Sequence, residues 1–415
     1  MSSGKLSIVN FSTADNEGGS ARSAYRIHCG LSSLGHNSKI LVGKKVMQDK
    51  DVDTVYGCGV LGRAANLLAD RLSRLLGYQY LYVPSSGRMM RHPWLKKPDI
   101  IQLYNTHGGY FSHTLLPKLS KIAPIVWRLS DLWPMTPHSA YTYSCECWKN
   151  GPENCVCKLS SYPPIYRNTK KMLWEVKERA YKDSDITVVA PSSWTENIAK
   201  QSKLLSRFPV YRIPNGIDLS VFKPQDKAAA RAEFGISKDA RVILFSAHGL
   251  DNNPRKGSNL LIKALNGLNL KNSLLLLVGE GGESFEKAVS MEVKRTGFIK
   301  DPAKLAKIYS CADFVVVPSE VENLPNNLLE CMACGVPSVA FDAGGMKDAV
   351  KHMETGYLAK NGDTEDFAAG IKLLAEDKGL AKKIGERARE LAVREFDQKR
   401  EAENFEKLYI KLCSR

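Results

Sequence analysis

Short runs of apolar residues alternate along the chain with longer stretches in which apolar residues recur at helical spacing. In the first half this pattern predicts strands at 6–11, 38–42, 100–103, 125–129 and 186–190, and helices at 21–34 and 170–182. The second half repeats it, with strands at 241–246, 273–278, 314–318 and 337–341 and helices at 259–266, 302–310, 326–334 and 364–376. Alternating strands and helices predict parallel sheets that are covered by helices on both faces.

Two such series predict an α/β protein with two doubly wound, Rossmann-like domains that face each other across a cleft. We expect the junction at residues 213–218, Ile-Pro-Asn-Gly-Ile-Asp, which gives domains at 1–212 and 213–395. Residues 396–415 are expected to form a C-terminal helix that crosses back to the first domain. Ligands of open parallel sheets bind at the carboxyl ends of the strands, so we look for chemistry there.

Composition fits a globular chain with positive charge concentrated in its first half. The 415 residues are 43% hydrophobic and 25% charged, and the formal net charge is +15. Residues 1–212 hold 29 Lys and Arg against 15 Asp and Glu, whereas residues 213–415 hold 30 against 29. Such a basic half fits a surface that faces nucleic acid, an acidic bilayer or a phosphorylated acceptor, although scattered charge also simply solvates a surface. Neither a long apolar stretch nor a secretory signal is visible, so we expect a cytoplasmic location.

The segment from Pro318 to Pro337 carries two glutamates, Glu322 and Glu330. Glu322 is expected in a loop after a strand, and Glu330 in the first turns of a helix that begins near Asn326, a residue type that favours the N-cap. A helix start presents N–H groups that bind phosphate, and carboxylates beside it accept hydrogen bonds from sugar or ribose hydroxyls. The same spacing also fits a Glu330 that complements the helix dipole and a solvated Glu322.

This segment resembles the E-x7-E signature of the family 4 retaining glycosyltransferases, which have the two-domain GT-B fold. Residues 335–337 (Gly-Val-Pro), 344–345 (Gly-Gly) and 213–218 also match that family. The resemblance implies that Glu322 lies near the donor sugar and that Glu330 bonds the nucleotide ribose. The second domain would then bind the nucleotide sugar and the first domain the acceptor. The chain is similar to family members of bacterial surface polysaccharide biosynthesis.

Two adjacent cations, Arg255 and Lys256, follow the first strand of the second domain. They can neutralise a diphosphate, Arg by bidentate contact and Lys as a point charge, although a solvated helix start has the same composition. The resemblance favours the diphosphate, because a Lys-Gly pair at this place binds the donor phosphates in the family. Many members carry their arginine directly after the strand, where this chain has Ala-His-Gly at 247–249. The resemblance implies five further donor-binding residues, Gly279, Phe298, Ile299, Asn326 and Leu328. For the glycine-rich stretches among them, a simple turn is the alternative.

Gly18 and Gly19 lie in a loop between the first strand and the first helix of the first domain. The loop is not a G-x-G-x-x-G dinucleotide fingerprint. It resembles the glycine-rich loop that closes over the donor diphosphate in the family, with a plain turn as the alternative. His107 and Asp131 follow two strands and join Glu322 as candidate catalytic residues. Relatives commonly have a histidine at the position of Ser130, so Asp131 is the nearest ionisable candidate there.

Four cysteines fall within thirteen residues: Cys145, Cys147, Cys155 and Cys157. In a reducing compartment such a group favours a structural zinc site over disulfides, with unligated thiols as the third alternative. A related subset of the family has cysteines in the same insert, one of them at the position of Ser139. The other six cysteines are interpreted as small buried residues.

The resemblance implies transfer of a sugar from a UDP- or GDP-linked donor to a hydroxyl of a glycan or lipid-linked acceptor, with retained anomeric configuration. The pathway would be exopolysaccharide, capsule or lipopolysaccharide biosynthesis. No catalytic cofactor is expected, because the chemistry of this fold is metal-independent and no Asp-x-Asp motif stands beside the phosphates. The alternatives are a sugar-nucleotide epimerase of the same fold and a pyridoxal-dependent phosphorylase. The alternative from another class is a nucleic-acid-binding module. We expect no nucleic acid as a partner, because binding nucleic acid would give the carboxylates of Glu322 and Glu330 no role.

Residues 62–78 have apolar positions at helical spacing and include Arg71 and Arg74. With Arg88 and Arg91 after them, they fit a helix that lies on an anionic bilayer at the inner face of the membrane, where a lipid-linked acceptor is found. An ordinary surface helix is the alternative.

Overall fold

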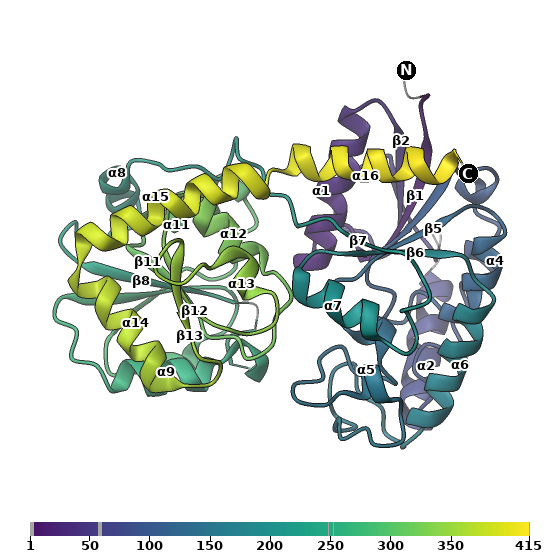
Figure 1. The fold of residues 1–415 in the computed structure, drawn as a ribbon, viewed down its shortest axis with the longest axis horizontal. Coiled ribbons are helices and arrows are strands. Elements are labelled where there is room, and N and C mark those ends of the chain that lie inside the picture. Colours follow the sequence, from purple (N-terminus) through teal and green to yellow (C-terminus); the bar gives the residue numbers. More distant parts are fainter. Residues whose placement is uncertain (1–3, 57–59, 248, 252, 415) are drawn as a thin grey trace. The chain divides into compact units, whose positions relative to one another are not determined.

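The computed structural model describes residues 4–56, 60–247, 249–251 and 253–414, which form two compact units (Figure 1). The first unit comprises Met1–Pro214 and Lys399–Arg415, and the second comprises Asn215–Gln398. The chain therefore returns to its first unit at the C-terminus. None of the described helices combines the length and apolar character that crossing a membrane requires.

The first unit is built on a sheet of seven parallel strands in the order β3-β2-β1-β4-β5-β6-β7. The strands are β1 (Ser7–Ala14), β2 (Asn37–Lys44), β3 (Val52–Thr54), β4 (Ile100–Leu103), β5 (Ile125–Arg128), β6 (Ile186–Ala190) and β7 (Val210–Arg212). The strand order reverses between β1 and β4, and ligands of open α/β sheets bind at the carboxyl ends of strands at such a point.

Helices cover both faces of this sheet, which is why its central strands β1, β4 and β5 bury nearly all of their residues. On one face, side chains of β1, β4 and β5 pack with α1 (Gly19–Ser33) and α16 (Gln398–Cys413). On the other face, alternate side chains of the same strands pack with α4 (Leu116–Ser120), α6 (Lys170–Lys182) and α7 (Ser193–Gln201). Tyr409 Oη of α16 donates a hydrogen bond to Gln102 Oε1 of β4 over 2.8 Å, which ties the returning helix to the sheet. The remaining helices of the unit are α2 (Val60–Leu76), α3 (Ser86–Met89), η1 (Pro93–Leu95), η2 (His113–Leu115), η3 (Trp133–Met135) and α5 (Cys147–Asn150).

The second unit repeats the architecture with six parallel strands in the order β10-β9-β8-β11-β12-β13. The strands are β8 (Arg241–Ser246), β9 (Ser273–Val278), β10 (Glu292–Arg295), β11 (Phe314–Val317), β12 (Ser338–Phe341) and β13 (Gly356–Ala359). Its order reverses between β8 and β11. The helices are α8 (Lys227–Glu233), η4 (Pro254–Lys256), α9 (Ser258–Asn266), α10 (Glu283–Ala288), α11 (Pro302–Cys311), α12 (Asn326–Ala333), α13 (Met346–Ala349), α14 (Thr364–Glu376) and α15 (Lys378–Glu395).

The predicted α/β class with two doubly wound, Rossmann-like sheets is confirmed, and nine of the strands coincide with predicted ones. The hydrophobic pattern misses β3, β7, β10 and β13, which are the edge strands of the two sheets. Strands β7 and β10 bury none of their residues fully, so they leave no apolar run in the sequence.

Candidate functional site

In the second unit, two cations and a carboxylate that lie far apart in the sequence form one cluster. Arg255 and Lys256 belong to η4 after β8, and Glu322 lies in the loop after β11. Arg255 Nη1 and Lys256 Nζ both donate to Glu322 Oε2, over 2.6 and 2.7 Å. Because β8 and β11 are neighbours at the point where the strand order reverses, their carboxyl ends bring these residues together.

Close backbone contacts hold the two loops in place. A Cβ at Gly257, which has a φ of +73°, would lie 1.8 Å from the carbonyl oxygen of Pro318. The N–H of Glu320 donates to the carbonyl of Arg255 over 3.2 Å. On the other side, a Cβ at Gly344 would lie 1.9 Å from the carbonyl oxygen of Glu322. The glycines of the predicted Lys-Gly and Gly-Gly motifs therefore allow the loops to approach closely enough for the cations to reach Glu322.

The cluster has an excess of positive charge in a largely buried place. Burial raises the pKa of Glu322, but Arg255 and Lys256 outweigh this effect and lower the pKa to about 2. Burial lowers the pKa of Lys256, and the charge of Glu322 opposes that change. Two cations facing one carboxylate leave a net positive charge, which is the electrostatic requirement for binding a further anion.

Glu330 lies in α12, where its side chain is 2% exposed and Oε2 accepts a hydrogen bond from Tyr309 Oη over 3.1 Å. Helix α12 begins at Asn326 as predicted, but its N-cap residue is Pro325, so the prediction of Asn326 as the N-cap is wrong. Asn326 Oδ1 accepts a hydrogen bond from Asn215 Nδ2 over 3.1 Å, so its side chain faces a neighbouring loop instead of capping the helix. The Leu328 side chain is fully buried in the core, which leaves only its main chain for a ligand.

The glycine-rich loops after β8, β9 and β10 lie against one another. A Cβ at Gly279 would lie 1.9 Å from the carbonyl oxygen of Ala247, and the Gly279 N–H donates to Gly297 over 3.1 Å. Phe298 follows with 38% of its surface exposed, whereas Ile299 packs against the core. The loops that carry the predicted base-binding residues therefore lie side by side at the carboxyl ends of β8, β9 and β10. His248, in the segment where relatives carry arginine, lies outside the described residues.

In the first unit, His107 and Asp131 form a buried hydrogen-bonded pair after β4 and β5. His107 Nε2 and Asp131 Oδ2 are 2.8 Å apart, and Asp131 Oδ1 accepts the N–H of Trp133 over 2.9 Å. The ring of Tyr162 packs edge-on against the His107 ring, with 5.5 Å between the centroids. The carboxylate therefore fixes the orientation of the imidazole.

The glycine-rich loop of the first unit lies next to this pair. Gly18 is the N-cap residue of α1, with a φ of +89° and open space where a Cβ would be, and Gly19 begins the helix. Ser20 Oγ of α1 is hydrogen-bonded to Ser130 Oγ over 2.7 Å. Ser130 therefore links the loop to the segment that carries Asp131.

Sequence reasoning missed Lys177 of α6, whose side chain is fully buried beneath the same segment. Lys177 Nζ donates to the carbonyls of Trp133 and Thr136 over 2.6 and 2.9 Å and lies 3.6 Å from the centre of the Trp133 ring. Burial lowers its pKa well below the ordinary value, and the charge of Asp131 opposes this change. Its sequence neighbours are charged helix residues, so no pattern distinguishes it from a solvated lysine.

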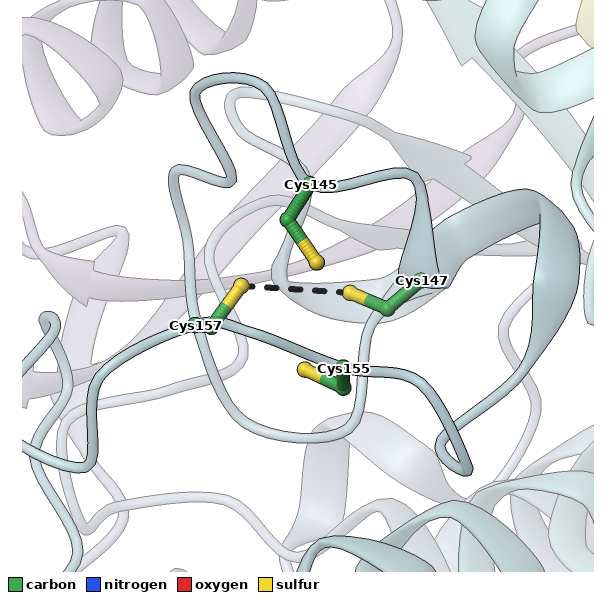
Figure 2. Close-up of side chains that lie close together, drawn as sticks. All are labelled: Cys145, Cys147, Cys155 and Cys157. Carbon is green, nitrogen blue, oxygen red and sulfur yellow. Dashed lines mark hydrogen bonds between the residues drawn. The ribbon is translucent and has the colours of Figure 1, made fainter.

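The four clustered cysteines lie together in the insert between β5 and α6. Figure 2 shows their thiols pointing toward a common centre. All four sulfur atoms lie within 4.8 Å of one another, and those of Cys147 and Cys157 are 3.9 Å apart. No disulfide bond joins any two of these four cysteines. Cys29 and Cys413 are exposed, so the interpretation of the remaining cysteines as buried is wrong for these two, and Cys58 lies outside the described residues.

Two family models match the chain in succession. The model described as "Glycosyltransferase Family 4" matches residues 17–221, and the model described as "Glycosyl transferases group 1" matches residues 226–391. This chain is a family 4 glycosyltransferase. Both the family prediction and the prediction of an enzyme are thereby confirmed.

Curated relatives of this glycosyltransferase align over part of their length. The D-inositol 3-phosphate glycosyltransferase of Mycobacteroides abscessus is 36% identical over 177 residues, which cover 40% of this chain and 38% of that protein. The chain thus spans about two fifths of the length of that relative.

Solved structures match the glycosyltransferase over nearly its full length and show the GT-B fold. Sucrose-phosphate synthase from Thermosynechococcus elongatus has a TM-score of 0.70 at 19% identity, covering 98% of this chain and 99% of that one. Anabaena Alr3699/HepE, solved in complex with UDP and glucose, has a TM-score of 0.66 at 19% identity, covering 97% and 99%.

Proposed function

We propose that this glycosyltransferase moves a sugar, with retention of its anomeric configuration, from a UDP- or GDP-linked donor to a hydroxyl of a glycan or lipid-linked acceptor. The second unit binds the donor and the first unit binds the acceptor. The pathway is exopolysaccharide, capsule or lipopolysaccharide biosynthesis. The observation that carries the proposal is the cluster of Arg255, Lys256 and Glu322, because it is a positively charged, largely buried site at the carboxyl ends of two strands.

The donor diphosphate is assigned to Arg255 and Lys256. Guanidinium and ammonium groups bind phosphate oxygens through charge-assisted hydrogen bonds, and burial strengthens these bonds. Glu330 bonds the ribose, and the loops at Gly279 and Phe298 receive the base. The UDP complex of the Anabaena protein, a structural neighbour, supports a nucleoside diphosphate as the ligand.

Transfer breaks the bond between the anomeric carbon and the diphosphate oxygen, and forms a bond between that carbon and the acceptor oxygen. Negative charge grows on the leaving diphosphate, where Arg255 and Lys256 stabilise it. Glu322 orients the sugar through hydroxyl contacts. His107, whose ring is held by its hydrogen bond to Asp131, positions the acceptor. Attack occurs on the face from which the diphosphate leaves, and a phosphate oxygen takes the proton of the acceptor hydroxyl. No metal or cofactor takes part in these steps.

A panel of UDP- and GDP-sugars tests this proposal. We expect one nucleotide class to raise the melting temperature of the protein, because a ligand that binds the folded state stabilises it by mass action. Incubation of that donor with glycan and lipid-linked acceptors should yield a product whose anomeric configuration, measured by NMR, equals that of the donor. A sugar that is interconverted without any acceptor would identify an epimerase instead. Inverted product would overturn the retaining mechanism.

We also propose that helix α2 docks the enzyme on an anionic bilayer, where lipid-linked acceptors are found. The helix buries the polar side chains of Asn66 and Ser73 and exposes apolar ones. Its exposed leucines are Leu67, Leu68, Leu72, Leu75 and Leu76, between 41% and 65% exposed. A helix with outward leucines and nearby cations is typical of an interfacial helix, because apolar side chains enter the bilayer and cations attract anionic headgroups. The basic excess of residues 1–212 supports a bilayer as the surface that is bound.

Replacing three of these leucines, as L68S/L72S/L75S, should abolish co-sedimentation with vesicles that contain an anionic phospholipid. The protein should lose this binding because the variant removes the apolar area that enters the bilayer. The matched control is Leu34→Ser, which changes an exposed leucine at the end of α1. Equal vesicle binding by the triple variant and the control would refute the docking role of α2. Tight binding to polyuridylate with a steep salt dependence would instead assign the basic surface of the first half to nucleic acid.

A further inference from the structure

We propose that Cys145, Cys147, Cys155 and Cys157 bind a zinc ion as a closed structural site. Their sulfur atoms lie within 4.8 Å of one another and converge on one point (Figure 2). In a tetrahedral site with Zn–S bonds of about 2.3 Å, the sulfurs are about 3.8 Å apart. The 3.9 Å between the sulfurs of Cys147 and Cys157 matches that spacing, whereas bonded sulfurs lie about 2.05 Å apart.

The ligand set favours zinc and indicates a structural role. Four thiolates in tetrahedral reach suit Zn²⁺, and a site whose four positions are all filled by protein has no place for substrate or catalytic water. Cys145, Cys147 and Cys157 are buried, at 5%, 2% and 7% exposure, so the centre is closed to solvent on most sides. The site is therefore structural and separate from the chemistry of sugar transfer.

The surroundings suit the negative charge of a zinc ion held by four thiolates. Lys170 Nζ, at the start of α6, donates to the Cys155 carbonyl over 2.8 Å, which places an ammonium group beside the ligand loop. Lys203 anchors the other side of the insert, because its N–H donates to the Trp148 carbonyl of α5 over 3.1 Å. The Lys170 ammonium offsets part of the charge of the centre, and the Lys203 contact holds α5, which carries Cys147, against the loop after α7.

A short chain of contacts joins the centre to the His107–Asp131 pair. Lys158, directly after Cys157, accepts a hydrogen bond from His138 Nε2 over 3.0 Å. Two residues after His138, the Ala140 N–H donates to the Tyr162 carbonyl over 2.7 Å. The Tyr162 ring in turn packs against His107. Zinc at the centre of the insert thus supports the segments that carry His138 and Tyr162, and the Tyr162 ring forms part of the wall around His107. That this wall contacts the acceptor rests on the proposed function, but the metal site does not.

The metal content of the purified full chain tests the site directly. After expression in zinc-supplemented medium, elemental analysis should find about one zinc per chain, and replacement by Co²⁺ should give the visible spectrum of a tetrahedral thiolate site. Cys145→Ser and Cys157→Ser should each lose the metal. The matched control, Cys413→Ser, changes an exposed cysteine of α16 and should keep it.

Several outcomes would overturn the zinc site. One is wild-type protein that contains no zinc and in which mass spectrometry finds the four thiols either free or joined in disulfides. Another is an iron–sulfur absorbance, and a third is zinc that both ligand variants retain. These readouts need no catalytic activity, so they stand even if the proposed function fails. If the variants do not fold, the zinc content and cobalt spectrum of the wild-type protein decide alone.

Hydrogen–deuterium exchange tests the structural role of the metal. Removal of zinc by a chelator should speed exchange in residues 131–169, including the peptides that carry Trp133 and Tyr162, because metal binding supplies folding energy to such a loop-rich insert. Peptides of the second unit should exchange unchanged, and UDP binding should be unaffected. Unchanged exchange at 131–143 and 160–166 in metal-free protein would show that zinc does not position the wall around His107.

Discussion

Lys256→Ala is expected to lower kcat/KM for the nucleotide sugar by about 10²–10³-fold, the loss typical when a preorganised group that stabilises developing negative charge is removed. The Lys256 side chain is 16% exposed and its Nζ lies 2.7 Å from Glu322 Oε2, so its charge acts in a place where water screens it weakly. As the sugar leaves the diphosphate, negative charge grows on the phosphate oxygens. Steady-state kinetics with the donor identified in the nucleotide-sugar panel measure the effect.

The affinity for UDP should fall together with turnover in Lys256→Ala, because the ammonium binds the diphosphate both before and during transfer. Lys263→Ala is the matched control, since Lys263 is an exposed lysine of the neighbouring helix α9. Circular dichroism and thermal unfolding establish that both variants are folded. If Lys256→Ala turns over the donor as fast as Lys263→Ala does, the diphosphate site lies elsewhere.

The layered fold follows from local sequence patterns, but the edges of its sheets do not. Central strands such as β8 and β11 are buried on both faces, so they appear as uninterrupted apolar runs. The edge strand β10 reads Glu-Val-Lys-Arg and buries none of its residues fully. Such a strand forms because a neighbouring strand offers a row of N–H and C=O groups, and no property of its own side chains records this.

The candidate site, like the fold, is predicted by the sequence only in part. Arg255, Lys256 and Glu322 follow strand ends, and parallel strands place their carboxyl ends at one edge, so the sequence predicts that they share a site. Their direct pairing depends on Gly257 and Gly344, whose close backbone approaches follow from tertiary packing.

The sequence does not reveal the contacts of Lys177 and Asn215, because these contacts depend on burial and on loops that are distant along the chain. Lys177 is buried against Trp133, and Asn215 Nδ2 donates to the Leu324 carbonyl over 2.9 Å just before α12. The junction motif at 213–218 therefore also positions the start of α12, a role that its sequence does not reveal.

Glu322→Gln is expected to separate turnover from diphosphate binding. Glu322 accepts hydrogen bonds from both Arg255 and Lys256, so it acts as their counterion before the donor arrives. This carboxylate competes with a diphosphate for the same two cations. Removing the charge therefore should leave UDP affinity unchanged or tighter, while the loss of sugar orientation lowers kcat by about 10²-fold. Calorimetry with UDP and steady-state kinetics measure the two effects separately.

The stability of the ligand-free variant provides an independent readout of the same cluster. The folded-state pKa of Glu322, about 2, lies below its ordinary value of 4.5. The ionised carboxylate therefore stabilises the fold above about pH 4.5, and this contribution is lost as the pH falls toward 2. The melting temperature of Glu322→Gln should lie below that of the wild type at neutral pH, and the difference should narrow on acidification.

Glu320→Gln is the matched control for Glu322→Gln, because Glu320 is in the same loop and its main chain contacts Arg255 and Asn361. It should keep wild-type turnover, UDP affinity and stability. A parallel fall of UDP affinity and turnover in Glu322→Gln would mean that Glu322 supports the diphosphate site instead of competing for its cations. Wild-type kcat in that variant would remove Glu322 from the mechanism.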